Sequence, residues 1–138
     1  MFDPLADTSV TFYPPPVVLV ASPLSRTRDL LADYLNACGF AVWTAEDGVQ
    51  ALDVYVRHLG GIDAVVADAA LPDLPGMAFV GRFRRHFPGV PVCVFTDDPF
   101  GQPAADLSAA GATVMPKPVH LRRLVEALRA VLAVDRSA

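Results

Sequence analysis

Five short apolar segments alternate along the chain with longer segments whose apolar residues recur at helical spacing. Each short segment is apolar at consecutive positions, which is typical of a parallel strand covered by helices on both faces. The alternation predicts five βα units, and right-handed crossovers would assemble them into one open, doubly wound α/β sheet. We expect the strands at residues 17–21, 40–44, 64–67, 92–95 and 112–115.

The segments between the strands carry apolar residues three and four positions apart, which predicts helices with one face in the core. We expect the fourth helix to be short and the most mobile, because Pro99, Gly101 and Pro103 restrict it to about residues 104–110. The predicted core stripes are Leu30, Leu31, Tyr34, Leu35 and Cys38; Leu52, Tyr55 and Leu59; Phe79, Val80, Phe83 and Phe87; and Leu121, Leu124, Val125, Leu128 and Leu132.

Composition and charge limit the classes of partner. The chain has 138 residues, 53% of them hydrophobic, with a net charge of −4. This charge argues against a nucleic-acid-binding surface, which needs a basic face. No apolar run approaches the roughly 18–20 residues that cross a bilayer, and the N-terminus lacks the features of a secretory signal. We therefore expect a cytoplasmic protein in which Cys38 and Cys93 are reduced core thiols.

The predicted elements define one domain with an extension at each end. Residues 1–16 show no periodicity and end in three consecutive prolines, so we expect a flexible arm with a stiff end. The folded domain is predicted to span residues 17–134, which leaves residues 135–138 as a short C-terminal tail.

Three polar residues follow predicted strands, where ligands of open α/β sheets bind. Asp68 follows the third strand, Thr96 ends the fourth and Lys117 follows the fifth. A carboxylate can serve as a nucleophile, a hydroxyl can hydrogen-bond a phosphoryl oxygen, and an ammonium group can offset the added negative charge. This trio suits the acceptance of a phosphoryl group.

Several short motifs occur in a specific order across residues 17–134. They are Val18-Leu19-Val20, Arg28-Asp29-Leu30-Leu31, Ala45-Glu46-Asp47-Gly48, Asp68 with Leu71-Pro72 and Gly76, Pro91 to Thr96, Gly111-Ala112, and Lys117-Pro118. Together they resemble the CheY-like receiver domain of two-component response regulators. The resemblance implies a flavodoxin/CheY-like sheet of order 2-1-3-4-5. It also implies that Asp68 is the phosphoacceptor, Thr96 the switch hydroxyl and Lys117 the phosphate-contacting lysine, with a cis peptide bond between Lys117 and Pro118.

The sequence departs from this family at two places. The family has two acidic residues directly after the first strand, and Ser22 and Pro23 occupy those positions here. The aromatic switch residue of the family falls on Val114. Magnesium prefers octahedral oxygen ligands that usually include one or two carboxylates, and this chain would offer only Asp68 and the Ala70 carbonyl. We therefore expect weak or absent Mg²⁺ binding, no other cofactor, and an ion pair between Asp68 and Lys117.

The favoured hypothesis is a non-enzymatic pseudo-receiver that signals through protein contacts without Mg²⁺-dependent phosphorylation. By resemblance, its partners are a sensor histidine kinase, a phosphotransfer protein or another signalling protein. The family's output face is the fourth helix, fifth strand and fifth helix, which would include Leu107, Arg122 and Arg123 and would also serve a homodimer. One alternative is a conventional receiver phosphorylated at Asp68. An alternative of another class is a small flavodoxin-like cofactor-binding enzyme.

Overall fold

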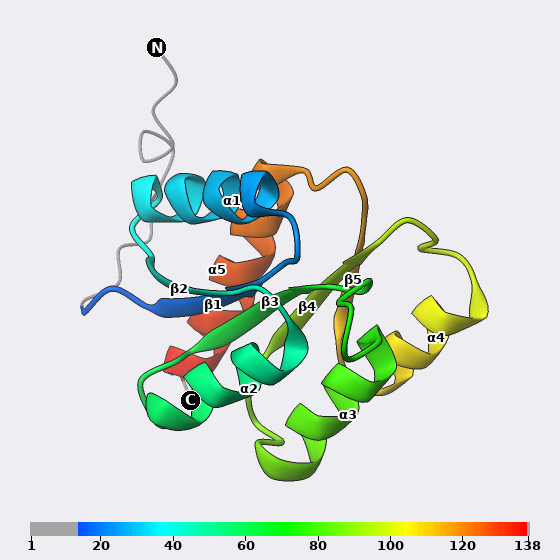
Figure 1. Cartoon of the computed structure of the whole chain (residues 1–138). Helices are drawn as coiled ribbons and strands as arrows, with labels where there is room; N and C mark the ends of the chain where they lie inside the picture. The colour runs from blue at the N-terminus through cyan, green and yellow to red at the C-terminus, as the bar shows by residue number, and fades with distance from the viewer. Residues whose placement is uncertain (1–13, 138) are drawn as a thin grey trace.

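A computed structural model describes residues 14–137, with side chains up to residue 132. Five parallel strands and five helices alternate along the chain, and the sheet order is β2-β1-β3-β4-β5, as predicted (Figure 1). The strands are β1 (Val17–Ala21), β2 (Ala41–Ala45), β3 (Ala64–Asp68), β4 (Val92–Thr96) and β5 (Thr113–Pro116). The helices are α1 (Ser25–Ala37), α2 (Gly48–Arg57), α3 (Gly76–His86), α4 (Gln102–Ala109) and α5 (Leu121–Ser137).

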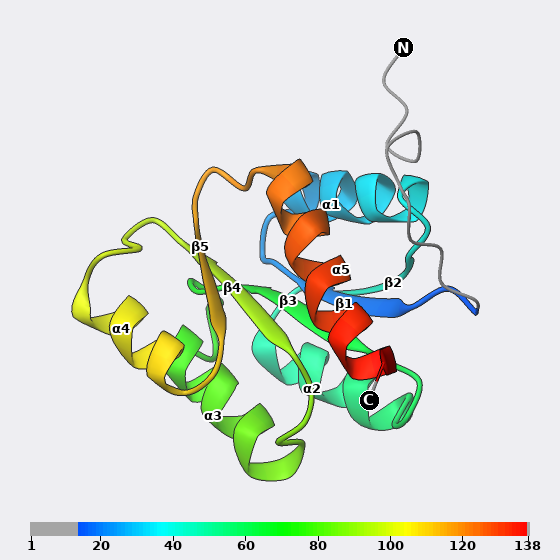
Figure 2. The same ribbon diagram turned by 180° about the vertical axis from the view of Figure 1, so that it is seen from behind.

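The sheet separates two hydrophobic cores. Alternate strand residues such as Leu19 and Val65 pack against α2, α3 and α4, while their neighbours Val18 and Val66 pack against α1 and α5. Figures 1 and 2 show these two helical layers from opposite sides of the molecule. Because successive side chains of a strand point to opposite faces, a strand between two helical layers must be apolar at every position. This explains the continuous apolar runs of the sequence.

Two strands begin one residue later than predicted, and the ends of the preceding helices explain the shift. The Phe40 N–H donates to the Leu35 carbonyl, and the Ala112 N–H donates to the Leu107 carbonyl. Each of these bonds follows a glycine at positive φ, Gly39 or Gly111, which is the arrangement of a Schellman C-cap. Phe40 and Ala112 therefore complete helix ends, so β2 begins at Ala41 and β5 at Thr113.

The fourth helix is also shifted from its predicted position. α4 spans Gln102–Ala109, with Pro103 in its first turn, where the missing N–H of proline has no intrahelical partner to lose. Leu107 was predicted to lie on the output face, but it is only 3% exposed. It packs into the core beside the sheet, because so short a helix has few other apolar side chains with which to cover that face.

The C-terminal helix extends further than predicted. We expected a tail at residues 135–138, yet α5 continues to Ser137. No glycine or proline follows Leu121 to end the helix. At the other end of the chain, residues 1–13 of the predicted flexible arm lie outside the described residues.

The predicted core stripes are mostly buried, with two clear exceptions. Leu30 on α1 is 54% exposed and Leu59, after α2, is 64% exposed, although both were assigned to the core. Leu59 was assigned from helical spacing, but α2 ends at Arg57. Its position is therefore no longer set by the helical period.

The two cysteines are buried and unpaired, as predicted. Burial raises the pKa of the Cys38 thiol and raises the pKa of the Cys93 thiol to about 11. Both side chains therefore remain protonated thiols at neutral pH. Among the described helices, none is long and apolar enough to cross a membrane.

Candidate functional site

The carboxyl ends of β3, β4 and β5 bring together the three residues singled out from the sequence. Asp68 ends β3 and Thr96 ends β4, while Lys117 follows β5. The backbone N–H of Lys117 donates to the Thr96 carbonyl at 2.9 Å, and its ammonium group reaches Asp68. We refer to the carboxyl edge of the sheet as the rim, and to this part of it as the β3–β5 end.

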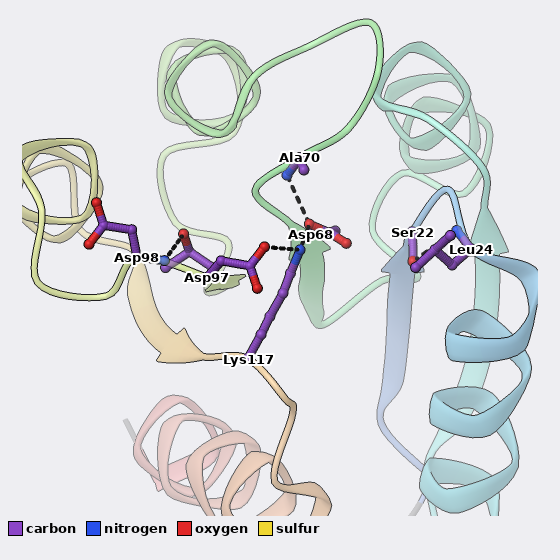
Figure 3. Close-up of polar contacts among 8 residues, drawn as sticks. Ser22, Leu24, Asp68, Ala70, Asp97, Asp98 and Lys117 are labelled. Atoms are coloured by element: carbon purple, nitrogen blue, oxygen red, sulfur yellow. Dashed lines mark hydrogen bonds and ion pairs between the residues drawn. The ribbon is translucent and has the colours of Figure 1, made fainter.

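Asp68 and Lys117 form the expected ion pair (Figure 3). Lys117 Nζ lies 2.8 Å from Asp68 Oδ1, and the Ala70 N–H donates to the same oxygen at 2.8 Å. The Asp68 side chain is only 4% exposed and that of Lys117 is 22% exposed. The Lys117–Pro118 peptide bond is cis, as the resemblance implied. A buried carboxylate requires such partners, because an unpaired buried charge is strongly destabilising.

A second carboxylate lies near the same lysine. Asp97 Oδ2 is 3.8 Å from Lys117 Nζ, but its side chain is 85% exposed. In water, an ion pair of this length contributes little to stability. Lys117 is therefore held chiefly by Asp68.

The Thr96 hydroxyl lies beside a cavity at the β3–β5 end. Thr96 Oγ1 accepts a hydrogen bond from the Asp98 N–H at 3.2 Å. The cavity has a volume of about 350 Å³, and Ala70, Thr96 and Lys117 line it together with Met77 and Leu107. The space is bordered by Thr96 and by Lys117, whose ammonium group is paired with Asp68, so the ion pair lies next to the cavity.

The rim is different where β1 ends. Ser22 is fully buried, and each of its polar groups already has a partner. Its N–H donates to the Ala45 carbonyl at 3.1 Å, and its hydroxyl accepts from the Leu24 N–H at 3.3 Å. Pro23 has no side-chain ligand atom. In Figure 3, Ser22 lies beside Leu24, on the opposite side of Asp68 from Asp97.

An arginine that the sequence analysis missed lies at this β1 end. Arg28 Nη1 donates to the Ser22 carbonyl at 2.7 Å, and Arg28 Nη2 lies 3.8 Å from Glu46 Oε1. Arg28 belongs to the Arg28-Asp29-Leu30-Leu31 motif, and its guanidinium group connects the end of β1 to Glu46, just after β2. A cation in the first turn of a helix interacts unfavourably with the helix dipole. This was the only sign in the sequence that Arg28 has a specific contact outside its own helix.

The side chains of the rim do not fit a magnesium ion. Asp68 is the one carboxylate at the strand ends that is buried, and its Oδ1 already contacts an ammonium group and an N–H. Over the part of the chain that the structure describes, no three His, Cys, Asp or Glu side chains lie close enough together to hold a metal ion. Magnesium dehydrates reluctantly and requires several oxygen ligands, so this donor set is insufficient.

A second missed residue connects the Asp68 loop to α2. Asp73 accepts hydrogen bonds from the Gly48 N–H at 2.7 Å and the Val49 N–H at 2.8 Å. Partial burial raises the pKa of Asp73, but backbone N–H groups, first those of Val49 and Gly48, outweigh it and lower the pKa overall. The first N–H groups of every helix need acceptors from elsewhere, although the sequence does not say which carboxylate will supply them.

The remaining predicted positions lie on β5 and α5. Val114 is half-buried opposite Val94, and it packs against the core that α2, α3 and α4 cover. Arg122 and Arg123 are exposed on α5.

The family model for the response regulator receiver domain matches residues 18–129. This chain belongs to that family. Response regulator MprA of Mycobacterium sp. (strain KMS) is 33% identical over 116 residues, which cover 83% of this chain and 50% of the relative. MprA of Mycobacterium tuberculosis (strain ATCC 25177 / H37Ra) is 32% identical over the same shares. The receiver domain therefore spans about half the length of the curated relatives that it matches.

Solved structures support the same fold. The signal receiver domain of an HD domain-containing protein from Pseudomonas fluorescens Pf-5 superposes with a TM-score of 0.81 at 23% identity, covering 90% of this chain and 99% of that one. CheY in the CheX–CheY–BeF3–Mg²⁺ complex from Borrelia burgdorferi gives 0.80 at 24% identity, covering 86% and 90%. The receiver domain is thus a module of two-component signalling with the CheY-like fold.

Proposed function

We propose that this receiver domain signals through protein contacts without Mg²⁺-dependent phosphorylation of Asp68. The observation that carries the proposal is the β1 end of the rim, where buried Ser22 and exposed Pro23 occupy the positions of the family's acidic pair. The Ser22 carbonyl there accepts from Arg28. Pro23 has no side-chain ligand atom, and the Ser22 hydroxyl already accepts from the Leu24 N–H, so neither residue supplies a carboxylate to a metal ion.

Charge explains why the acidic pair matters. A dianionic phosphoryl donor that approaches an ionised aspartate is repelled, and a metal ion normally neutralises part of that charge. In this chain, Lys117 is the cation next to Asp68, and it is already paired with that carboxylate. The proposed resting state is therefore a receiver in which the Asp68–Lys117 pair persists.

The partners follow from the family. A sensor histidine kinase, a phosphotransfer protein or another signalling protein would contact the domain in the cytoplasm, and exposed Arg122 and Arg123 on α5 would belong to the output face, without nucleic acid as a ligand. In this role the domain has no catalytic activity of its own.

A conventional phosphoaccepting receiver is the second candidate. The retained trio of Asp68, Thr96 and Lys117, together with the adjoining cavity, favours it. The two candidates differ in a single measurable property, which is the transfer of a phosphoryl group to Asp68 in the presence of Mg²⁺.

Incubation with acetyl phosphate and Mg²⁺, followed by intact-mass analysis, tests the proposal. We expect the wild type to gain no phosphoryl group, and Asp68→Asn provides the background. A Ser22→Asp/Pro23→Asp variant, which restores both carboxylates, should gain a phosphoryl group under the same conditions. A Mg²⁺-dependent gain in the wild type that Asp68→Asn abolishes would establish the conventional receiver instead.

A further inference from the structure

The cavity at the β3–β5 end has an apolar lining where α3 and α4 border it. The two helices lie side by side (Figure 1), and both contribute residues to the lining. Met77, at the start of α3, is 41% exposed, and Leu107 on α4 is buried. Pro75 and Pro103 line the cavity as well. None of these four side chains carries a charge, so this part of the cavity favours the aliphatic part of a ligand.

The charged lining of the cavity is acidic overall. Asp97 and Asp98 follow β4, line the cavity and are exposed. Among the described residues that line it, Lys117 is the only cation, and Lys117 is paired with Asp68 at 2.8 Å. Three carboxylates and one ammonium group (−3 and +1) give these side chains a formal net charge of −2. A hollow with one sign of charge attracts ligands of the opposite sign, so this cavity favours a cation.

An exposed aromatic side chain lies on the loop between β4 and α4, close to the cavity in sequence. Phe100 is 98% exposed, and it follows Asp98 by two residues and precedes Pro103 by three. A ring that lies wholly in water contributes nothing to the domain's own core. Aromatic rings at such positions are typical anchors of protein–protein contacts, because they bury a large apolar area at a small entropic cost.

We infer that the cavity is a docking site for an arginine side chain of a partner protein, and that Phe100 contacts an apolar residue beside that arginine. The inference rests on the proposed function, in which the domain acts through protein contacts and the Asp68–Lys117 pair persists. An arginine side chain combines an aliphatic stem with a terminal cation. The cavity offers a surface for each of these two parts.

Each part of the arginine side chain contacts a different part of the cavity. The aliphatic stem packs against Met77 and Leu107, and the guanidinium group pairs with the carboxylates of Asp97 and Asp98. A guanidinium group carries several N–H donors in one plane, so it can pair with two carboxylates at once, whereas a lysine ammonium group acts as a point charge. Because both carboxylates are exposed, little desolvation opposes the contact.

Other occupants fit this cavity less well. A metal ion requires several oxygen ligands, and the described part of the chain has no cluster of three His, Cys, Asp or Glu side chains. An anionic side chain would meet Asp97 and Asp98, while the cation of the cavity, Lys117, is already paired. Arg122 and Arg123 of the output face do not belong to the described lining, so the docking site is a separate surface.

Titration of isotope-labelled protein with n-propylguanidinium, followed by the NMR shifts of backbone amides, tests the cavity. This molecule reproduces the arginine side chain, and n-propylurea is a neutral control of nearly the same shape. We expect saturable shifts of amides in residues 69–77 and 96–107, which include the lining. The dissociation constant should be about millimolar, because the fragment is small. n-Propylurea should bind about fivefold more weakly, because exposed charge pairs contribute modestly.

Two double variants distinguish the acidic residues of the cavity from the charge of the whole domain. Asp97→Asn/Asp98→Asn should bind n-propylguanidinium no more tightly than n-propylurea. Asp29→Asn/Asp33→Asn removes the same charge from exposed positions on α1, and it should keep the preference of about fivefold for the cation. Thermal melting of each variant checks that it is folded.

A pair of peptides tests the role of Phe100. Acetyl-Leu-Arg-Leu-amide should bind the wild type more tightly than acetyl-Gly-Arg-Gly-amide, because Phe100 contacts a flanking leucine. Phe100→Ala should abolish this difference, whereas Leu30→Ala, which truncates a leucine that is 54% exposed on α1, should not. A difference that survives Phe100→Ala would overturn the role given to Phe100.

Three results would each overturn the inference as a whole. They are shifts confined to residues outside the cavity, equal affinity of the wild type for n-propylguanidinium and n-propylurea, and a cation preference that survives Asp97→Asn/Asp98→Asn. All of these titrations use unphosphorylated protein without Mg²⁺, so absence of binding overturns the inference and leaves the proposed function standing. A Mg²⁺-dependent phosphoryl gain in the mass assay contradicts the proposed function instead, so the two failures are distinguishable.

Discussion

The two ends of the rim have different chemistry, although they belong to one sheet. At the β3–β5 end, Thr96 and Lys117 line a cavity, and the buried Asp68 carboxylate is paired with Lys117 at 2.8 Å. At the β1 end, Ser22 is buried with its hydrogen bonds satisfied, and Arg28 contacts its carbonyl. Under the proposed function, the β3–β5 end is the part of the site that would accept charge, and the β1 end offers no carboxylate to a metal ion that would neutralise it.

The geometry of the β3–β5 end does not depend on the residues at the β1 end. The ion pair at the β3–β5 end contains its own counter-charge, so it requires nothing from the β1 end to remain buried. The Asp68–Lys117 pair is therefore compatible with a β1 end that carries Ser22 and Pro23 in place of carboxylates.

The strongest test of the β3–β5 end removes its cation. Lys117→Met should destabilise the domain by about 3 kcal/mol, because it leaves the Asp68 carboxylate buried without a counter-charge. Urea denaturation measures the effect. Asp68→Asn/Lys117→Met should lower the free energy of unfolding by less than Lys117→Met alone. Asp53→Ala, which breaks an exposed ion pair with Arg57, should lower it by at most about 0.5 kcal/mol. A Lys117→Met cost as small as that of Asp53→Ala would show that the pair is not buried in solution.

The opposite change restores charge at the β1 end. Ser22→Asp/Pro23→Asp should lose about 2 kcal/mol of stability without metal, because the new carboxylates replace a satisfied buried serine and repel Asp68. Mg²⁺ should restore that stability by binding only the folded state.

Calorimetric titration with Mg²⁺ compares the variant with the wild type, which we expect not to bind at low millimolar concentration. Ser25→Asp, an exposed change three residues further on, is the control for added charge alone. If the wild type binds Mg²⁺ as tightly as the double variant, the two ends of the rim do not differ as we describe.

A smaller effect concerns the connection between the β3–β5 end and α2. Asp73→Asn should cost about 1 kcal/mol at neutral pH, a size typical for the loss of a side-chain acceptor at a helix N-terminus. The pKa of Asp73 is lowered in the folded state. Its contribution is therefore present above the unfolded carboxyl pKa of about 3.9 and is lost as the pH falls through the lower folded-state pKa.

Urea unfolding of wild type and Asp73→Asn across this pH range tests the sign. The difference in free energy of unfolding between the two proteins should be largest at neutral pH and should decrease as the solution becomes acidic. Asp33→Asn, an exposed carboxylate on α1, should show no such difference. A difference in free energy of unfolding that increases in acid would contradict the hydrogen bonds from the Gly48 and Val49 N–H groups to Asp73.

The smallest effect is local and leaves global stability unchanged. α4, next to Thr96, buries only Ala104 and Leu107, whereas α5 buries Leu124, Val125, Leu128 and Leu132. Amide hydrogen exchange should therefore be faster in α4 than in α5 under native conditions. Equal protection of the two helices would show that the helix at the cavity opens only with the whole domain.

The predictions from sequence succeeded where a residue's neighbours along the chain decide its environment. Continuous apolar runs identified all five strands, and the polar residues after them identified the β3–β5 end. The predictions were wrong where tertiary packing or the end of an element decides the outcome. Leu107, which was assigned to the output face, is buried because the sheet lies against α4, and Leu59 is exposed because α2 ends two residues before it.

The sequence by itself determined the class of fold, the order of the elements and the absence of carboxylates after β1, because these depend on periodicity and on residue type. Only the tertiary structure showed that Arg28 reaches the Ser22 carbonyl, six residues away, and that Asp73 accepts from N–H groups 24 and 25 residues away. The tertiary fold determines which donor and acceptor groups come close enough to form these hydrogen bonds. A side-chain acceptor or donor has no periodicity, so its partner cannot be derived from the sequence pattern.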